Sequence, residues 1–112
     1  MRLTDLDRMT EFAIEALSSN DAKQISALVR RMVEKWPQLP ALSITFAITS
    51  AAAHLETLFA DIQTERSAAR AYKLAALVAS DILALEAMGG RPIMCHDLLH
   101  YWQRMDPYFL KL

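Results

Sequence analysis

The sequence predicts an all-α fold, a compact bundle of about five helices in one domain spanning residues 1–112. The chain holds only two glycines and four prolines, so few positions interrupt a helix. Apolar residues recur every three to four positions along several segments, which is the period of one helix face. Alternation typical of a strand occurs at 42–49, but a strand needs a partner and no other segment offers one. The helical interpretation is therefore preferred there too.

The first two helices are predicted from polar ends and apolar stripes. The first is expected to begin at Thr4, with Asp5 favourably placed against its positive N-terminal end, and to stop in the polar run 18–21. Asp21 then caps a second helix, which Pro37 ends. The apolar residues of this second helix give the cleanest helical pattern in the chain: Ile25, Leu28, Val29, Met32, Val33 and Trp36.

The segment 41–88 contains no strong helix breaker, yet a single straight helix of that length would exceed the norm for globular proteins. An apolar stripe runs from Ile44 to Ile62 and includes Phe59, which predicts a third helix. We place a bend or a turn within 61–67. Whether 41–88 forms one bent helix or two remains open at this point.

The next helix, 68–88, is apolar on almost every side, which predicts that it is central and surrounded by the others. The pair Gly89-Gly90 supplies its stop, because glycine adopts the left-handed conformation that ends many helices. Pro92 then opens a fifth helix that runs to about Met105.

Composition favours self-association. Apolar residues make up 54% of the chain, and a domain of 112 residues has little interior in which to hide them. We therefore expect a homodimer or a higher homo-oligomer, with a further protein partner as an alternative. The candidates for the contact are aromatic and large aliphatic residues near breaks and near the C-terminal tail, and core packing is the alternative for each of them: Trp36, Leu42, Phe46, Tyr108 and Phe109.

Charge argues against nucleic acid as a partner, because the formal net charge is −1. One basic strip stands out, formed by Arg66, Arg70 and Lys73 at positions i, i+4 and i+7. It is either a solvated helix face or a weak site for an acidic partner or a nucleic acid. A nucleic-acid site would require this strip to merge with a second cluster on one surface: Arg30, Arg31 and Lys35.

The segment 95–102 concentrates residue types that bind metals or catalyse reactions. His96 and His100 share one helix face, which points away from the core, and could hold zinc or another divalent metal. His54 or Glu56, from a neighbouring helix or subunit, is the candidate for a further ligand. Asp97 stands where the metalloprotease motif H-E-x-x-H has glutamate, and its shorter side chain argues against that chemistry. An ordinary polar face and a proton-sensitive contact are the alternatives for the two histidines.

The remaining patterns favour binding over catalysis. Cys95 falls on the buried side of its helix, where a lone thiol behaves as a small apolar group. No cofactor motif is present apart from the two outward histidines. The N-terminal residues lack the apolar run of a signal peptide, and the apolar stretch 74–85 is too short for a membrane span. We expect a cytoplasmic, non-catalytic helical protein with a binding or regulatory role.

Overall fold

Seven helices form the chain in a computed structural model that describes residues 2–58, 61–89 and 91–112. They are α1 (Leu3–Ser18), α2 (Ala22–Ser26), α3 (Leu28–Lys35), α4 (Leu42–Leu58), α5 (Ile62–Gly89), α6 (Cys95–Arg104) and α7 (Tyr108–Lys111). The predicted all-α bundle is confirmed. The helix count is higher than expected because the second helix is divided and the C-terminal tail forms a short helix of its own.

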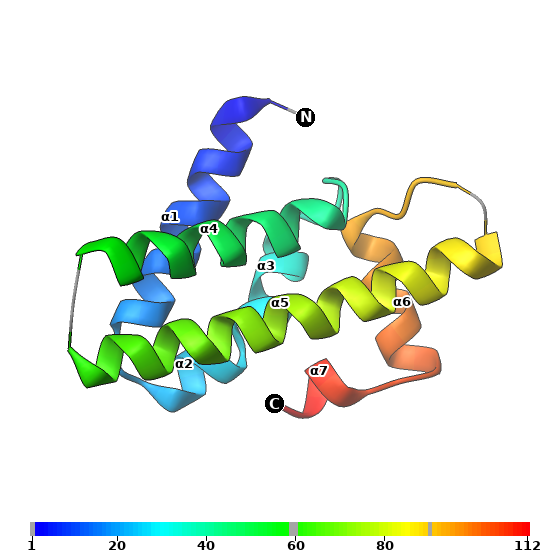
Figure 1. Cartoon of the computed structure of the whole chain (residues 1–112). Coiled ribbons are helices and arrows are strands. Elements are labelled where there is room, and N and C mark those ends of the chain that lie inside the picture. The colour runs from blue at the N-terminus through cyan, green and yellow to red at the C-terminus, as the bar shows by residue number, and fades with distance from the viewer. Residues whose placement is uncertain (1, 59–60, 90) are drawn as a thin grey trace.

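The two long helices α4 and α5 run side by side in opposite directions, and α1 packs against both of them (Figure 1). Alanines line the inner sides of the long pair, among them Ala51 and Ala52 on α4 and Ala71 and Ala75 on α5. Small side chains let helix backbones approach closely, so the pair packs tightly along its length. The shorter helices α3, α6 and α7 contact one another and complete the core.

Helix α5 is enclosed on one side only. Its inner residues are buried, but Leu83 and Met88 on other sides are 66% and 61% exposed. The prediction that this helix is surrounded therefore holds for its inner face and is wrong for its outer face. No other part of the described chain covers that outer face.

The break between α4 and α5 lies earlier than the sequence predicted. Helix α4 ends at Leu58 and α5 begins at Ile62, so 41–88 forms two helices. The Oδ1 atom of Asp61 accepts a hydrogen bond of 2.8 Å from the amide of Thr64 in the first turn of α5, which places the start of that helix. The apolar stripe of α4 ends at Leu55, because Leu58 and Ile62 are both exposed. Phe59, which the sequence also assigned to the stripe, lies outside the described residues.

The predicted second helix is divided at Ala27, which forms a turn between α2 and α3 and has dihedral angles of φ −86° and ψ −3°. Its apolar stripe is nevertheless buried as predicted, apart from the half-buried Trp36. Asp21 caps α2 by accepting a hydrogen bond of 2.9 Å from the amide of Lys23. Residues 19–21 connect α1 to α2. Within this connection Asn20 has a positive φ of 59°, which lets the chain turn sharply.

Helix α6 begins at Cys95 instead of at Pro92, because the residues before it pair with the segment that leads into α4. The amide of Ala41 donates to the carbonyl of Ile93 at 2.8 Å, and the amide of Cys95 donates to the carbonyl of Leu39 at 2.8 Å. These bonds fix the start of α6 against the start of α4. At the preceding helix end, α5 stops at Gly89 as predicted, and Gly90 lies outside the described residues.

Within the described ranges, no helix combines the length and the apolar character that a bilayer span requires.

Candidate binding sites

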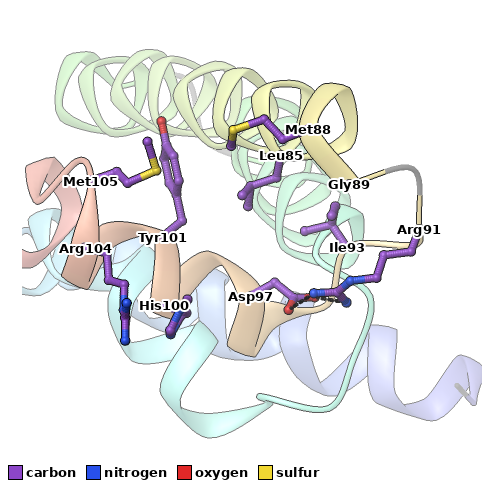
Figure 2. Close-up of a pocket in the computed structure, with 10 residues that line it drawn as sticks. All are labelled: Leu85, Met88, Gly89, Arg91, Ile93, Asp97, His100, Tyr101, Arg104 and Met105. Atoms are coloured by element: carbon purple, nitrogen blue, oxygen red, sulfur yellow. Dashed lines mark hydrogen bonds and ion pairs between the residues drawn. The ribbon is translucent and has the colours of Figure 1, made fainter.

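A pocket of about 280 Å³ lies between the C-terminal end of α5 and one side of α6 (Figure 2). We call it the α5–α6 pocket. Its lining comes from both helices and from the loop between them: Leu85, Met88, Gly89, Arg91, Ile93, Asp97, His100, Tyr101, Arg104 and Met105. Part of the segment 95–102 that stood out in the sequence therefore borders a real concavity.

The walls of this pocket are apolar. Figure 2 shows Tyr101 and Met105 rising from α6 toward α5, and Leu85 and Met88 projecting from α5 into the same space. Met88 and Met105 are both largely exposed although they are apolar. Unbranched methionine side chains adapt to irregular shapes, so these walls suit an apolar ligand group or side chain.

An ion pair closes one end of the pocket. The guanidinium of Arg91 donates two hydrogen bonds to the carboxylate of Asp97, at 2.7 Å and 3.0 Å. Asp97 also accepts a bond of 2.9 Å from the amide of Met94, which caps α6. The Arg91 contact, with the capping bond, lowers the pKa of Asp97 although partial burial opposes this. The pair holds the loop after α5 against α6 and leaves that end without net charge.

The three histidines are exposed. His96 lies next to the ion pair, with its Nδ1 atom 3.5 Å from Asp97 Oδ1, while His100 borders the α5–α6 pocket. His54 is exposed on α4. Nowhere in the ranges that the structure describes do three histidine, cysteine or acidic side chains gather closely enough to hold a metal ion. The contribution of His54 to a metal site shared between subunits stays a prediction.

The other side of α6 packs into the core as the helical period predicted. Cys95 is fully buried and its Sγ atom lies 3.8 Å from the carbonyl oxygen of Pro40. Burial raises the pKa of the Cys95 thiol to about 12. A thiol with that pKa is protonated at neutral pH, so Cys95 packs as an apolar group and is a poor nucleophile.

Two of the five candidate contact residues pack within the chain. Phe109 is 2% exposed, and its ring centroid lies 4.9 Å from that of Trp102. Trp36 is half-buried and meets the ring of Phe12 edge-on at 5.4 Å. For both residues the core-packing alternative describes what the structure shows.

The other three candidates are exposed: Leu42, Phe46 and Tyr108. Leu42 and Phe46 belong to a stripe on α4 with the spacing i, i+4, i+7 and i+11, and α5 carries a stripe with the same spacing. We call these stripes together the α4–α5 face: Leu42, Phe46, Thr49 and Ala53 on α4, and Ala76, Ser80, Leu83 and Ala87 on α5, all exposed. The face lies opposite the buried residues of both helices.

The predicted basic strip lines a second concavity, of about 480 Å³, between α5 and α7. We call it the basic groove. Its lining residues are Arg66, Ala69, Arg70, Lys73, Leu74, Leu77 and Tyr108. The three cations predicted from the sequence are thus brought together with Tyr108, which the sequence had grouped with the contact residues.

The sequence did not indicate the α5–α6 pocket as a whole. Leu85 and Met88 belong to one helical pattern and Tyr101 and Met105 to another, and no spacing rule relates two helices across a loop. The pair Arg91–Asp97 spans that loop and lacks the i, i+4 spacing of a helical ion pair. Comparison with known proteins adds no further site residue, since no family model, curated protein or solved structure matches this chain.

Proposed function

We propose that this chain is a non-catalytic binding protein that self-associates through its α4–α5 face. One observation supports this most strongly: the eight residues of the face are exposed in a single chain and none is charged, and the next residues along the two stripes, Glu56 on α4 and Lys73 on α5, bound it with charges. Solvent-facing sides of helices normally carry charged side chains, and an exposed apolar surface of this kind is typical of an interface.

The charge pattern of the two helices extends this observation. From residue 41 to residue 55 the chain contains no aspartate, glutamate, lysine or arginine. From residue 74 to residue 85 it contains only Asp81, which accepts a hydrogen bond from Trp102 on another side of α5. The segments 41–55 and 74–85 are therefore suited to burial on their outer as well as their inner sides.

A second copy of the chain suits this face better than a charged partner. The face carries large side chains at Leu42, Phe46 and Leu83 and small ones at Ala53 and Ala76. A two-fold contact brings the same patch of each subunit together, so ridges of one copy can enter the small-residue positions of the other. Two α4–α5 pairs would then form a four-helix arrangement. This occupant also supplies the cover that the apolar outer side of α5 lacks.

The free energy of apolar burial available on this face is of the order that association requires. Burying one large apolar side chain contributes roughly 1.5–3 kcal/mol, and a two-fold contact buries each of the three twice. Association itself costs at least about 4 kcal/mol in lost translational and rotational freedom. Because Leu42, Phe46 and Leu83 are 63%, 54% and 66% exposed, their burial offers part of the figure for a whole side chain, and the total is of the same order as an association cost of about 4–15 kcal/mol.

The test compares molar masses by light scattering after gel filtration at one protein concentration. The double variant Phe46→Glu/Leu83→Glu places charges on the face and should elute as a monomer, while the unaltered chain is a dimer. The matched control is Leu3→Glu, because Leu3 is the most exposed large apolar residue, at 80%, and lies on α1 outside the face. The control should keep the mass of the unaltered chain. Equal masses for all three proteins would exclude this face as the contact.

The α5–α6 pocket supports a second candidate function, binding of a small ligand. The observation in its favour is that His100 and Arg104 line the same pocket as the apolar walls, with their side chains extending from α6 away from α5 (Figure 2). An elongated apolar ligand with a carboxylate would suit both, and decanoate is a practical probe. Calorimetric titration should show binding that Tyr101→Ala weakens. Absence of heat with millimolar decanoate would reject this candidate.

A metal at the two outward histidines remains part of this second candidate. Two ligands from one helix leave a divalent ion incompletely coordinated, so zinc would need further ligands from another copy. The variant His96→Ala/His100→Ala should then lose zinc that the unaltered chain retains in native mass spectrometry. A chain that retains no zinc and gains no stability from it would remove this possibility.

We also propose a cytoplasmic location, in agreement with the sequence-based expectation. The single thiol of Cys95 has no partner in its own chain, which suits a reducing compartment. Fractionation of cells that express the protein, followed by detection with a specific antibody, would test the location.

A further inference from the structure

We propose that the basic groove binds an acidic, amphipathic segment of a partner protein. Arg66, Arg70 and Lys73 line it from α5, and Tyr108 lines it from α7. Carboxylates are attracted to the three cations, and apolar side chains fit the surfaces between them. The occupant thus has to carry both kinds of side chain.

The cations of the groove meet no acidic side chain among the described residues that line it. Arg66 and Arg70 are four residues apart and Arg70 and Lys73 three apart, so each pair repels along the helix. Arg70 donates a hydrogen bond to the hydroxyl of Ser26, which is neutral. A bound carboxylate would relieve repulsion that the folded chain tolerates when the groove is empty.

A neighbouring hollow extends the cationic surface. It lies on α2 and α3, and its lining includes Lys23, Ser26, Arg30 and Leu112. Ser26 is the hydroxyl that Arg70 contacts, so the hollow adjoins the basic groove. Arg30 faces Glu34 at 3.6 Å, a partly exposed pair that neutralises it only in part. The two concavities together can accommodate an extended segment and not only a single anion.

The apolar parts of the groove distinguish an acidic peptide from a simple polyanion. Leu74 is buried and Leu77 half-buried beneath the groove, while the ring of Tyr108 is 45% exposed at its edge. Burying apolar side chains of a peptide against these three residues adds affinity that phosphate or heparin cannot gain. This is the reason for specifying a segment that combines carboxylates with apolar side chains.

Nucleic acid is the less favoured occupant because the two basic clusters merge only in part. Arg30 lies beside the groove, but Arg31 and Lys35 lie over the ring of Phe12, at 4.9 Å and 5.5 Å from its centroid. These two cations therefore stack on an aromatic ring that is not part of the groove. The remaining basic surface is short, and the net charge of −1 gives no wider field to attract a polyanion.

Fluorescence anisotropy tests the proposal with a labelled synthetic peptide of alternating Glu-Glu-Leu and Glu-Glu-Phe triplets. The control probes are the same peptide with Gln in place of every Glu, and a labelled oligouridine RNA. The unaltered chain should bind the acidic peptide, with an affinity that falls steeply as salt is raised. Binding of the RNA as tightly as the peptide, or of the Gln peptide as tightly as the Glu peptide, would overturn the proposal. So would a failure to bind the acidic peptide at low salt.

Two charge-matched variants locate the site on the chain. Arg66→Gln/Arg70→Gln/Lys73→Gln removes three cations from the groove and should weaken binding about tenfold or more. Arg8→Gln/Arg31→Gln/Lys35→Gln removes three exposed cations elsewhere and should leave affinity within about twofold. Equal loss in both variants would show a nonspecific effect of charge and overturn the assignment to the groove. If a triple variant does not fold, the two single variants Lys73→Gln and Tyr108→Ala replace it, and each should weaken binding of the acidic peptide.

The groove shares no residue with the α4–α5 face. The groove variants should consequently retain the mass of the unaltered chain in gel filtration. A change of mass without a change of peptide affinity would count against the groove proposal, whereas loss of peptide binding at constant mass would support it.

Discussion

The indole Nε1 of Trp102 donates a hydrogen bond of 2.8 Å to Oδ2 of Asp81, which joins α6 to α5 beneath the surface of the bundle. Trp102 is fully buried, so its N–H group needs an acceptor inside the protein. Asp81 is partly buried, and desolvation raises its pKa although the bond from Trp102 opposes this and the nearby Asp106 adds to it. The only charged residue within 74–85 is therefore explained by packing.

Removing this acceptor should destabilise the fold. Asp81→Ala leaves the buried indole N–H without a partner, which is expected to cost about 1–3 kcal/mol in the free energy of unfolding. Asp81→Asn retains an acceptor oxygen and should lose clearly less. Urea denaturation measures both variants against the unaltered chain. Equal losses for alanine and asparagine would indicate that the hydrogen bond is not the source of the stabilisation.

The ion pair at the end of the α5–α6 pocket predicts a dependence of stability on pH. Contact with Arg91 and the capping bond lower the pKa of Asp97 in the folded state. The stabilisation is therefore fully present above the unfolded-state pKa of about 3.9, and it is lost as pH falls through the lower folded-state pKa. Asp97→Asn should be less stable than the unaltered chain by about 1 kcal/mol at pH 6, from loss of the charged cap.

The quantity to measure is the difference in the free energy of unfolding between the unaltered chain and Asp97→Asn, because the other acidic residues contribute equally to both proteins. It should narrow as the pH is lowered from 6 toward 3 in urea denaturation. A difference that stays constant over this range would mean that ionised Asp97 adds no stability beyond that of a neutral amide.

The burial of Cys95 predicts that its thiol is alkylated slowly in the folded protein. With a pKa of about 12, Cys95 is a thiolate in about one molecule in ten thousand at pH 8. Native protein should therefore resist iodoacetamide for hours, and the same protein in urea should react fully within minutes. Mass spectrometry reports the extent of alkylation. Rapid modification of the native chain would show that α6 opens frequently or that Cys95 is accessible.

The helices and their buried sides could be predicted because amphipathic spacing extends over whole elements. The stripe Ile25–Val33, the helical interpretation of 42–49 and the division of α6 into a packing side with Cys95 and an outward side with His96 and His100 all follow from that spacing. The positions at which one helix ends and the next begins were predicted less well. The apolar pattern continues through Ala27 and through Ile62, whereas a turn at Ala27 separates α2 from α3 and α5 begins at Ile62.

The sites depended on tertiary packing that spacing does not encode. The basic strip was visible because its three cations lie on one helix, but its combination with Tyr108 depends on how α7 folds back against α3. Phe109 and Tyr108 are adjacent in the sequence, yet one is buried and the other is exposed. Only the position of α7 decides which of the two can meet a partner.

The central claim is self-association through the α4–α5 face, and native mass spectrometry of the unaltered protein tests it most directly. One chain has a mass of 12.6 kDa, so a dimer has twice that mass, about 25 kDa. We predict the dimer mass at micromolar concentration, and its conversion to the monomer mass in the variant Phe46→Glu/Leu83→Glu. A mass of 12.6 kDa for the unaltered chain at every concentration up to the millimolar range would contradict the account.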